Sequence, residues 1–188
     1  NDLARVDYTG STSSLLAEPQ RTNLVTYSSD FEGVSGWSKV AANITPDSAT
    51  APDGTMTATK VVASSGDSSI RKSFAFTSGD IVTISSYIRS VDGFGNQSIR
   101  LALGSNASIS SKVFTVTEEW QRFSYSATVL SDGVLVVHPL GGYGGFTTGQ
   151  EVFLWGAQLE IGSYATSIIP TSGSTVTRVQ DQYSKTGI

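Results

Sequence analysis

Short stretches in which apolar and polar residues alternate follow one another along almost the whole chain, and they constrain its fold more than any other feature. Alternation places every second side chain on the same face of a β-strand, so one face can be buried while the other meets solvent. Clusters of Gly, Asp and Ser separate the stretches at the spacing of an all-β domain. The pattern predicts strands at 21–27, 36–44, 57–63, 68–76, 80–90, 97–104, 111–117, 119–129, 132–139 and 150–160.

Helical periodicity is nearly absent, because no window combines apolar residues at helical spacing with a capping residue at its start. About ten strands without helices are typical of two antiparallel sheets that pack face to face, and by strand count of a jelly roll. The turns agree with this assignment. In Ala51-Pro52-Asp53-Gly54, proline presets its own φ and glycine accepts a positive φ. We therefore predict an all-β, two-sheet antiparallel β-sandwich of the jelly-roll type.

The 188 residues are enough for one domain with a sizeable core. We expect this jelly-roll domain at 21–169, after an N-terminal extension or linker at 1–20. The segment 170–188 is expected to be a C-terminal linker toward a neighbouring domain, because its first residues are small and polar and cannot build a core.

Composition excludes several classes of function. The chain has no cysteine, which removes disulfides and thiolate metal sites. Its net charge is −4 and its Lys and Arg residues are scattered, which argues against a nucleic-acid partner. No apolar run approaches the roughly 20 residues that span a bilayer, so we expect no membrane insertion. Few charged residues and many hydroxyls are typical of extracellular or virion β-proteins.

The sequence contains no recognisable catalytic motif. It has no Gly-x-Ser-x-Gly elbow, no His-Glu-x-x-His and no glycine-rich phosphate loop. The one histidine, His138, ends an apolar strand pattern and is interpreted as a hydrogen-bonded structural residue. We therefore predict that the chain is not an enzyme.

Three residues of one predicted sheet face are candidate sugar contacts. Alternation turns Tyr87 and Arg89 outward in 80–90 and Arg100 outward in 97–104. If these strands are antiparallel neighbours, the three side chains share one face. An aromatic ring can stack on the apolar face of a sugar while Arg bonds its hydroxyls. An ordinary solvated sheet face with one exposed tyrosine is the alternative interpretation.

A second candidate locus is the glycine-rich loop at 141–149. It carries two aromatic residues, Tyr143 and Phe146, that no strand alternation would bury. Loops of this kind often make contacts, so we predict both residues as ligand-binding.

Asp30 and Glu32 flank Phe31 just after the first predicted strand. Carboxylates in a turn can wrap oxygen ligands around Ca²⁺, a hard cation that takes six to eight oxygens. Solvated turn acids are the alternative, and both interpretations stay open at this point.

Several strings spread over nearly the whole chain resemble a module that is widespread in bacteriophage tail fibres and other virion structural proteins. They are LLAEPQRTNLVTYS at 15–28, DF at 30–31, Trp37, APDGT at 51–55, WQR at 120–122, WGAQLE at 155–160, IPT at 169–171 and TR at 177–178. The resemblance implies a jelly roll related to carbohydrate-binding modules, embedded in a longer fibre or spike protein.

The opening pattern Asn23-Leu24, Asp30-Phe31-Glu32 and Trp37 is also similar to that of xylan-binding jelly-roll modules of plant-wall hydrolases. Those modules often carry a structural calcium, held partly by acids of the closing strand. This chain has Trp155 and Gly156 where they tend to place an Asp pair, which puts the full calcium site in doubt.

We therefore predict a non-catalytic glycan- or receptor-binding module of a phage tail fibre or another virion protein, located on the virion or outside the cell. The expected partners are a host cell-surface or environmental polysaccharide and other domains or protomers of a fibre. One alternative is a structural spacer or decoration domain that mediates subunit contacts in a virion. A polysaccharide lyase or hydrolase is the third, since two acids distant in sequence can meet in space.

Overall fold

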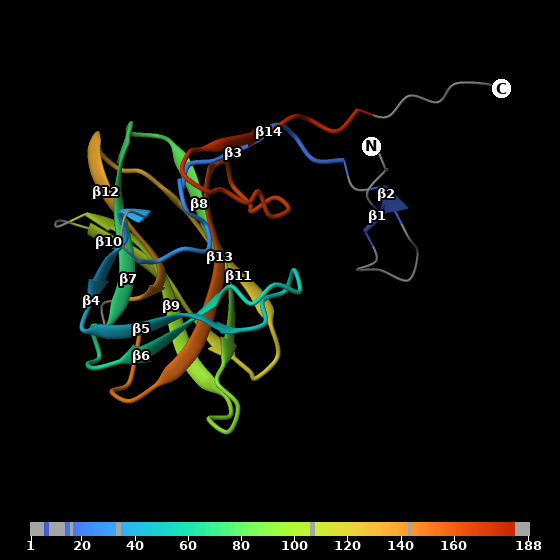
Figure 1. The fold of residues 1–188 in the computed structure, drawn as a ribbon. Helices are drawn as coiled ribbons and strands as arrows, with labels where there is room; N and C mark the ends of the chain where they lie inside the picture. The colour runs from blue at the N-terminus through green and yellow to red at the C-terminus, as the bar shows by residue number, and fades with distance from the viewer. Residues whose placement is uncertain are drawn as a thin grey trace.

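The computed structural model describes residues 6–7, 14–15, 17–32, 35–105, 108–142 and 144–182. All named elements within these ranges are β-strands (Figure 1). They are β1 (Val6–Asp7), β2 (Ser14–Leu15), β3 (Arg21–Asn23), β4 (Ser38–Val40), β5 (Ala42–Ala49), β6 (Ala58–Ala63), β7 (Ser69–Phe76), β8 (Ile81–Ser90), β9 (Gln97–Ser105), β10 (Ser108–Val116), β11 (Gln121–Thr128), β12 (Gly133–Gly141), β13 (Glu151–Ile161) and β14 (Val176–Arg178).

Two five-stranded sheets form the body of the protein. Sheet I has the strand order β10-β9-β12-β7-β4, and sheet II has the order β11-β8-β13-β6-β5. All strand pairs within them are antiparallel. The predicted all-β, two-sheet antiparallel sandwich is confirmed.

The predicted strand at 36–44 is two strands in different sheets. β4 pairs with β7 in sheet I, whereas β5 pairs with β6 in sheet II. The chain changes sheet at Ala41, whose φ of 44° lies in the left-handed region. Because the polar and apolar pattern does not change at this point, alternation could not reveal the crossing.

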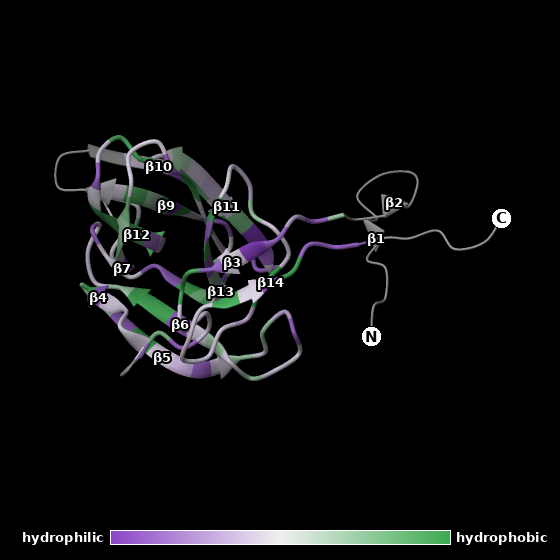
Figure 2. Ribbon diagram, turned by 90° about the horizontal axis from the view of Figure 1, so that it is seen from above, coloured by the Kyte–Doolittle hydropathy of each residue, from purple (hydrophilic) through white to green (hydrophobic). Residues whose placement is uncertain are grey.

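The main core lies between the two sheets and is aliphatic and aromatic. Its fully buried side chains include Phe31, Ile70, Ile84, Leu101 and Leu154. The hydropathy colouring shows strongly apolar stretches in β6 and β13 (Figure 2). β13 is buried from Val152 to Glu160, because loops cover the outer face of sheet II as well.

Asn23 fastens the opening segment to the closing strand. Its side-chain oxygen accepts hydrogen bonds from the backbone N–H of Val25 and of Leu159, both at 3.1 Å. Its amide nitrogen donates to the carbonyl of Ile169 at 2.9 Å. The side chain is fully buried, so this fixed amide holds three separate segments together.

Parts of both expected linkers pack on the sandwich. β14 pairs with β3, and the two leave the body side by side (Figure 1). Glu18 forms an ion pair with Arg178 at 2.9 Å, and the backbone N–H of Asp181 donates to the carbonyl of Glu18 at 3.0 Å. Residues 17–20 and 170–182 therefore contribute to the folded unit.

None of the described residues forms a helix that is long and apolar enough to cross a membrane.

Candidate functional site

Tyr87 and Arg89 lie on one side of the sandwich and Arg100 lies on the other. Tyr87 and Arg89 are on the outer face of β8 in sheet II, between β11 and β13. Arg100 is in β9 of sheet I, between β10 and β12. The expectation that the three share a face is wrong. Strands β8 and β9 are consecutive in sequence, but the connection between them crosses from one sheet to the other.

Tyr87 and Arg89 belong to a second, smaller core on the outer face of sheet II. The rings of Tyr87 and Trp155 have centroids 5.6 Å apart. The guanidinium of Arg89 lies 4.5 Å from the ring centroid of Phe153 and 5.7 Å from that of Trp120. These stacked contacts account for the half-buried state of both residues.

The indoles of this cluster are bonded to the loop that follows β5. Trp120 donates to the carbonyl of Thr50 at 3.0 Å, and Trp155 donates to the Thr57 hydroxyl at 3.1 Å. Their N–H groups and much of their ring surface are therefore used within the protein. The cluster therefore fixes a loop, and the ligand contacts predicted for Tyr87 and Arg89 stay a prediction.

A bulge in β13 explains why Trp155 faces outward. The register to β8 shifts between Trp155 and Gln158, and Gly156 has a φ of 65°. One extra residue reverses the alternation, so Phe153 and Trp155 join the outer cluster while Ala157 and Leu159 face the main core. An uninterrupted alternation would place all four side chains in one core, and the bulge prevents this.

The glycine-rich loop folds against the turn before β7. The backbone N–H groups of Gly142, Gly144 and Phe146 donate to the Ser68 carbonyl, an Asp67 carboxylate oxygen and the Gly66 carbonyl, at 2.9, 2.9 and 3.2 Å. The Phe146 ring is only 6% exposed and lies in the main core, where it anchors the loop. Tyr143 lies outside the described residues, and its role stays a prediction.

The same loop lies directly on two side chains of sheet I. A Cβ at Gly142 would lie 2.8 Å from Nδ1 of His138, and a Cβ at Gly145 would lie 2.6 Å from Cβ of Arg100. Gly142 also has a φ of 84°, which favours glycine. The glycines therefore allow the loop to contact β12 and β9, and the structure brings Arg100 together with this loop.

The outer face of sheet I forms what we call the basic face: Arg71 on β7, His138 on β12 and Arg100 on β9, with the hydroxyls of Ser73 and Ser98. The three strands are neighbours in the order β9-β12-β7. Arg71, Ser73 and Ser98 are exposed, Arg100 is half-buried and His138 is buried beneath the loop. Guanidinium and hydroxyl groups in this arrangement can bond polar ligands across three strands.

His138 is uncharged at neutral pH. Burial, and secondly the positive charge of Arg71, lower the pKa of its imidazole from 6.5 to about 4. It lies opposite Ala102 in the sheet, at a bulge between β12 and β7. Its hydrogen-bonded structural role stays a prediction from the sequence.

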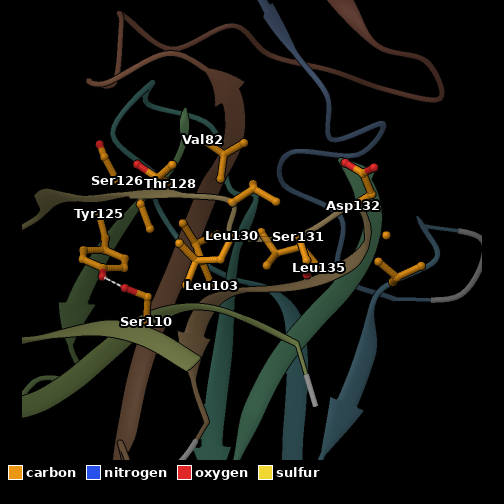
Figure 3. Close-up of a pocket in the computed structure, with 14 residues that line it drawn as sticks. Val82, Leu103, Ser110, Tyr125, Ser126, Thr128, Leu130, Ser131, Asp132 and Leu135 are labelled. Carbon is orange, nitrogen blue, oxygen red and sulfur yellow. Dashed lines mark hydrogen bonds between the residues drawn. The ribbon is translucent and has the colours of Figure 1, made fainter. Parts of the chain in front are cut away.

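A pocket of about 480 Å³ opens at another place, between the two sheets at the edge formed by β10 and β11 (Figure 3). Leu103, Val82 and Leu135 line its inner part, and Tyr125 and Ser110 close one end by a hydrogen bond between their hydroxyls. Asp132 lies at the other end and accepts a hydrogen bond from the Ser78 N–H at 2.7 Å. Alternation gave no sign of this pocket, because it arises where the edges of two sheets separate.

The turn that carries Asp30 and Glu32 is held by contacts within the protein. Asp30 accepts a hydrogen bond from the Glu32 N–H at 2.8 Å, and Glu32 lies 3.7 Å from the Lys39 ammonium. In the part of the chain that the structure describes, no group of three or more His, Asp or Glu side chains is placed to hold a metal ion. These contacts do not support the calcium site expected at Asp30 and Glu32.

The side chain of Lys72 bonds two oxygen atoms of the segment between Thr26 and Trp37. The Lys72 ammonium donates to the Ser35 carbonyl at 2.8 Å and to the Thr26 hydroxyl at 3.0 Å. It also lies 5.8 Å from the ring centroid of Trp37, and burial lowers the pKa of its ammonium. Lys72 therefore joins β7 to the segment between Thr26 and Trp37.

Solved structures with a similar fold include carbohydrate-binding modules and part of a phage protein. The CBM22-1 xylan-binding domain of Paenibacillus barcinonensis Xyn10C has a TM-score of 0.57 and 13% identity, over 77% of this chain and 94% of that chain. The C-terminal family 22 carbohydrate-binding module of Clostridium thermocellum Xyn10B has a TM-score of 0.56 and 16% identity, over 76% and 98%.

The enzymatically active domain of tailspike protein 4 from bacteriophage CBA120 has a TM-score of 0.51 and 8% identity, over 73% of this chain and 21% of that chain. No family model matches the sequence, and no curated protein matches it. At such low identities the likeness concerns the fold alone, and the chain thus has the β-sandwich fold of carbohydrate-binding modules.

Proposed function

We propose that this β-sandwich is a non-catalytic glycan-binding module and that its basic face is the binding surface. The observation that carries the proposal is the basic face itself: Arg71 and Ser73 on β7 and Ser98 and Arg100 on β9 flank β12, next to a loop fixed by hydrogen bonds. A rigid sheet surface keeps the entropic cost of binding low, because few side chains must be ordered. The fold shared with carbohydrate-binding modules supports this function.

The proposal is tested by a glycan array on the domain, followed by calorimetric titration with the sugars that bind. Replacing Arg100 or Arg71 by Ala should weaken binding about ten-fold or more, because each loses a charged hydrogen-bond donor at the surface. Arg21→Ala is the matched control, since Arg21 lies on β3 and stacks on Tyr164 at 5.5 Å, away from sheet I. Equal affinities of all four proteins would refute the assignment of the surface.

The biological setting that we propose is a bacteriophage tail fibre or another virion protein that binds a host cell-surface or environmental polysaccharide. The motifs at 15–31 and 154–160 and the likeness to a phage tailspike chain support it. In that setting the module works on the virion, outside the cell, together with other domains or protomers of a fibre. Immunolabelling of virions from a phage that encodes the chain is the direct test.

A structural role in a virion is the second candidate, and one observation favours it. Leu130 and Val134, which both line the pocket shown in Figure 3, are 76% and 61% exposed. Exposed apolar side chains of this kind are often covered by a partner protein. A stable oligomer in light scattering that Leu130→Ser and Val134→Ser dissociate, together with an empty glycan array, would favour a spacer or decoration domain over glycan binding.

A further inference from the structure

The five strands of sheet I contain cations and no carboxylate. Their sequences include no Asp or Glu, and their Lys and Arg residues are Lys39, Arg71, Lys72, Arg100 and Lys112. The chain as a whole has 16 acidic and 12 basic residues, with a net charge of −4. The strands of sheet I therefore carry positive charge alone, and acidic residues such as Asp67 and Asp132 lie in the turns beside them.

We propose, on the basis of the proposed function, that the basic face binds a polysaccharide whose sugars carry carboxylates, such as a uronic acid polymer, in preference to a neutral one. The ligand contacts would be Arg71 and Arg100. Both belong to the outer face, whereas Lys72 points into the protein and Lys39 lies near Glu32.

The spacing of the backbone positions of Arg71 and Arg100 suits an extended ligand. Arg71 and Arg100 are on strands β7 and β9, with β12 between them. Neighbouring strands are about 4.8 Å apart, so the two backbone positions are separated by about 10 Å across the sheet. Two carboxylates of one polymer chain could each meet one guanidinium, while Ser73 and Ser98 bond its hydroxyls.

The chemistry of arginine favours a carboxylate over a neutral hydroxyl at these positions. A guanidinium binds a carboxylate through two parallel hydrogen bonds, which a single hydroxyl cannot make. Arg100 is half-buried beside Gly145, so its charge is less screened by water than that of an exposed side chain. On this face an anionic sugar would therefore form paired hydrogen bonds and would also be attracted by the opposite charge.

The groups around the two arginines do not oppose an anion. The outward residues that accompany them on β7, β12 and β9 are Ser73, Ala75, Val134, Val136, His138, Ser98, Ala102 and Gly104. His138 stays neutral and does not repel or attract charge at pH 7. The carboxylate of Asp67, in the turn before β7, accepts the Gly144 N–H and so holds the loop.

The decisive experiment compares acidic polysaccharides with the same polymers after chemical reduction of their carboxyl groups. The probes are alginate, polygalacturonate and hyaluronan, each native and carboxyl-reduced, titrated into the full chain. We expect at least one native polymer to bind ten-fold or more tightly than its reduced form, with an affinity that falls between 50 and 500 mM NaCl.

The variants separate charge from hydrogen-bond geometry. Arg71→Glu and Arg100→Ala should lose the preference for the native polymer, whereas Arg100→Lys should retain it in part, because lysine keeps the charge without the two-pronged donor. Arg71 is exposed, so its variant tests the inference even where the Arg100 variants fold poorly.

The experiment distinguishes a failure of the proposed carboxylate preference from a failure of the proposed glycan-binding function. Native and reduced polymers that bind equally well, with no effect of salt, would overturn the preference for carboxylates and leave the glycan-binding function in place. A chain that binds none of the probes and no sugar on a glycan array would overturn both.

Discussion

A Cβ atom at Gly145 would lie only 2.6 Å from the Cβ of Arg100, so the glycine-rich loop and strand β9 are in direct backbone-to-side-chain contact. Neither atom is at the flexible end of a side chain, and neither can move without its backbone. This contact fixes the position of the loop relative to the basic face.

From this contact we expect that even a substitution by alanine at Gly145 destabilises the protein. Gly145→Ala should lower the free energy of unfolding by about 1–3 kcal/mol, as overpacking of a tight contact does. It should also weaken glycan binding, because the loop must move off Arg100. Urea denaturation and calorimetry measure the two effects.

Gly66→Ala is the matched control. A Cβ at Gly66 meets only the Phe146 carbonyl at 3.5 Å, which is ordinary contact, and neither Gly66 nor Gly145 has a positive φ. Its free energy of unfolding should change by less than about 1 kcal/mol. Equal losses in the two variants would show that Gly145 is not tightly packed against Arg100.

Because of His138, the free energy of unfolding should depend on pH. Its pKa is about 4 in the folded protein and 6.5 in the unfolded chain, so the unfolded chain takes up the proton first as the pH falls. The neutral imidazole of His138 thus contributes about 2–4 kcal/mol to the free energy of unfolding. This contribution is complete above about pH 6.5 and declines as the pH falls toward 4. Urea denaturation of the parent and of His138→Gln at several pH values isolates it from the titration of carboxylates.

A second measurement reports the same group directly. The chain has one histidine, so a single imidazole resonance can be followed by NMR. It should titrate near pH 4 in the folded protein. A midpoint near 6.5 would mean that the imidazole is not held away from solvent beneath Gly142.

The ion pair between Glu18 and Arg178 is expected to matter more than that between Glu32 and Lys39. The Glu18 and Arg178 side chains are 8% and 18% exposed, and Glu18 also accepts the Ser167 N–H at 2.7 Å. Arg178→Met should cost about 2–4 kcal/mol, because a buried carboxylate loses its countercharge. Lys39→Met, in a pair that is 38% and 42% exposed, should cost less than about 1 kcal/mol.

Truncation tests whether the C-terminal segment is part of the domain. A chain that ends at 169 lacks β14, the Arg178 contact and the hydrogen bond from the Thr171 N–H to the Ser28 hydroxyl at 3.0 Å. It should melt at a clearly lower temperature than a chain that ends at 182. Identical melting curves would support the boundary at 169 predicted from the sequence.

Removal of divalent cations should leave stability unchanged. Asp30 bonds the Glu32 N–H, and Lys72 supplies the positive charge that joins the opening segment to β7. EDTA should therefore shift the melting temperature by less than about 1 °C. A drop that added Ca²⁺ reverses would establish a calcium site after all, and Asp30→Asn and Glu32→Gln would then locate it.

Most strands could be predicted because their physical cause is local. In β8, Val82, Ile84 and Ile88 face the main core and Tyr87 and Arg89 face outward, as alternation predicts. The errors occur where the backbone departs from a regular strand. A single residue at Ala41 moves the chain to the other sheet, and the bulge at Gly156 turns Trp155 from one core to the other.

The amino-acid sequence by itself determined the fold class, the approximate positions of the strands and which side chains of a regular strand share a face, because these depend on a two-residue period. Only the tertiary structure decided which strands are neighbours, since pairing depends on how connections cross between sheets. That decision separated Tyr87 and Arg89 from Arg100 and placed Arg100 with His138, Arg71 and the glycine-rich loop. The candidate site is therefore a product of long-range packing, which no local pattern of residues records.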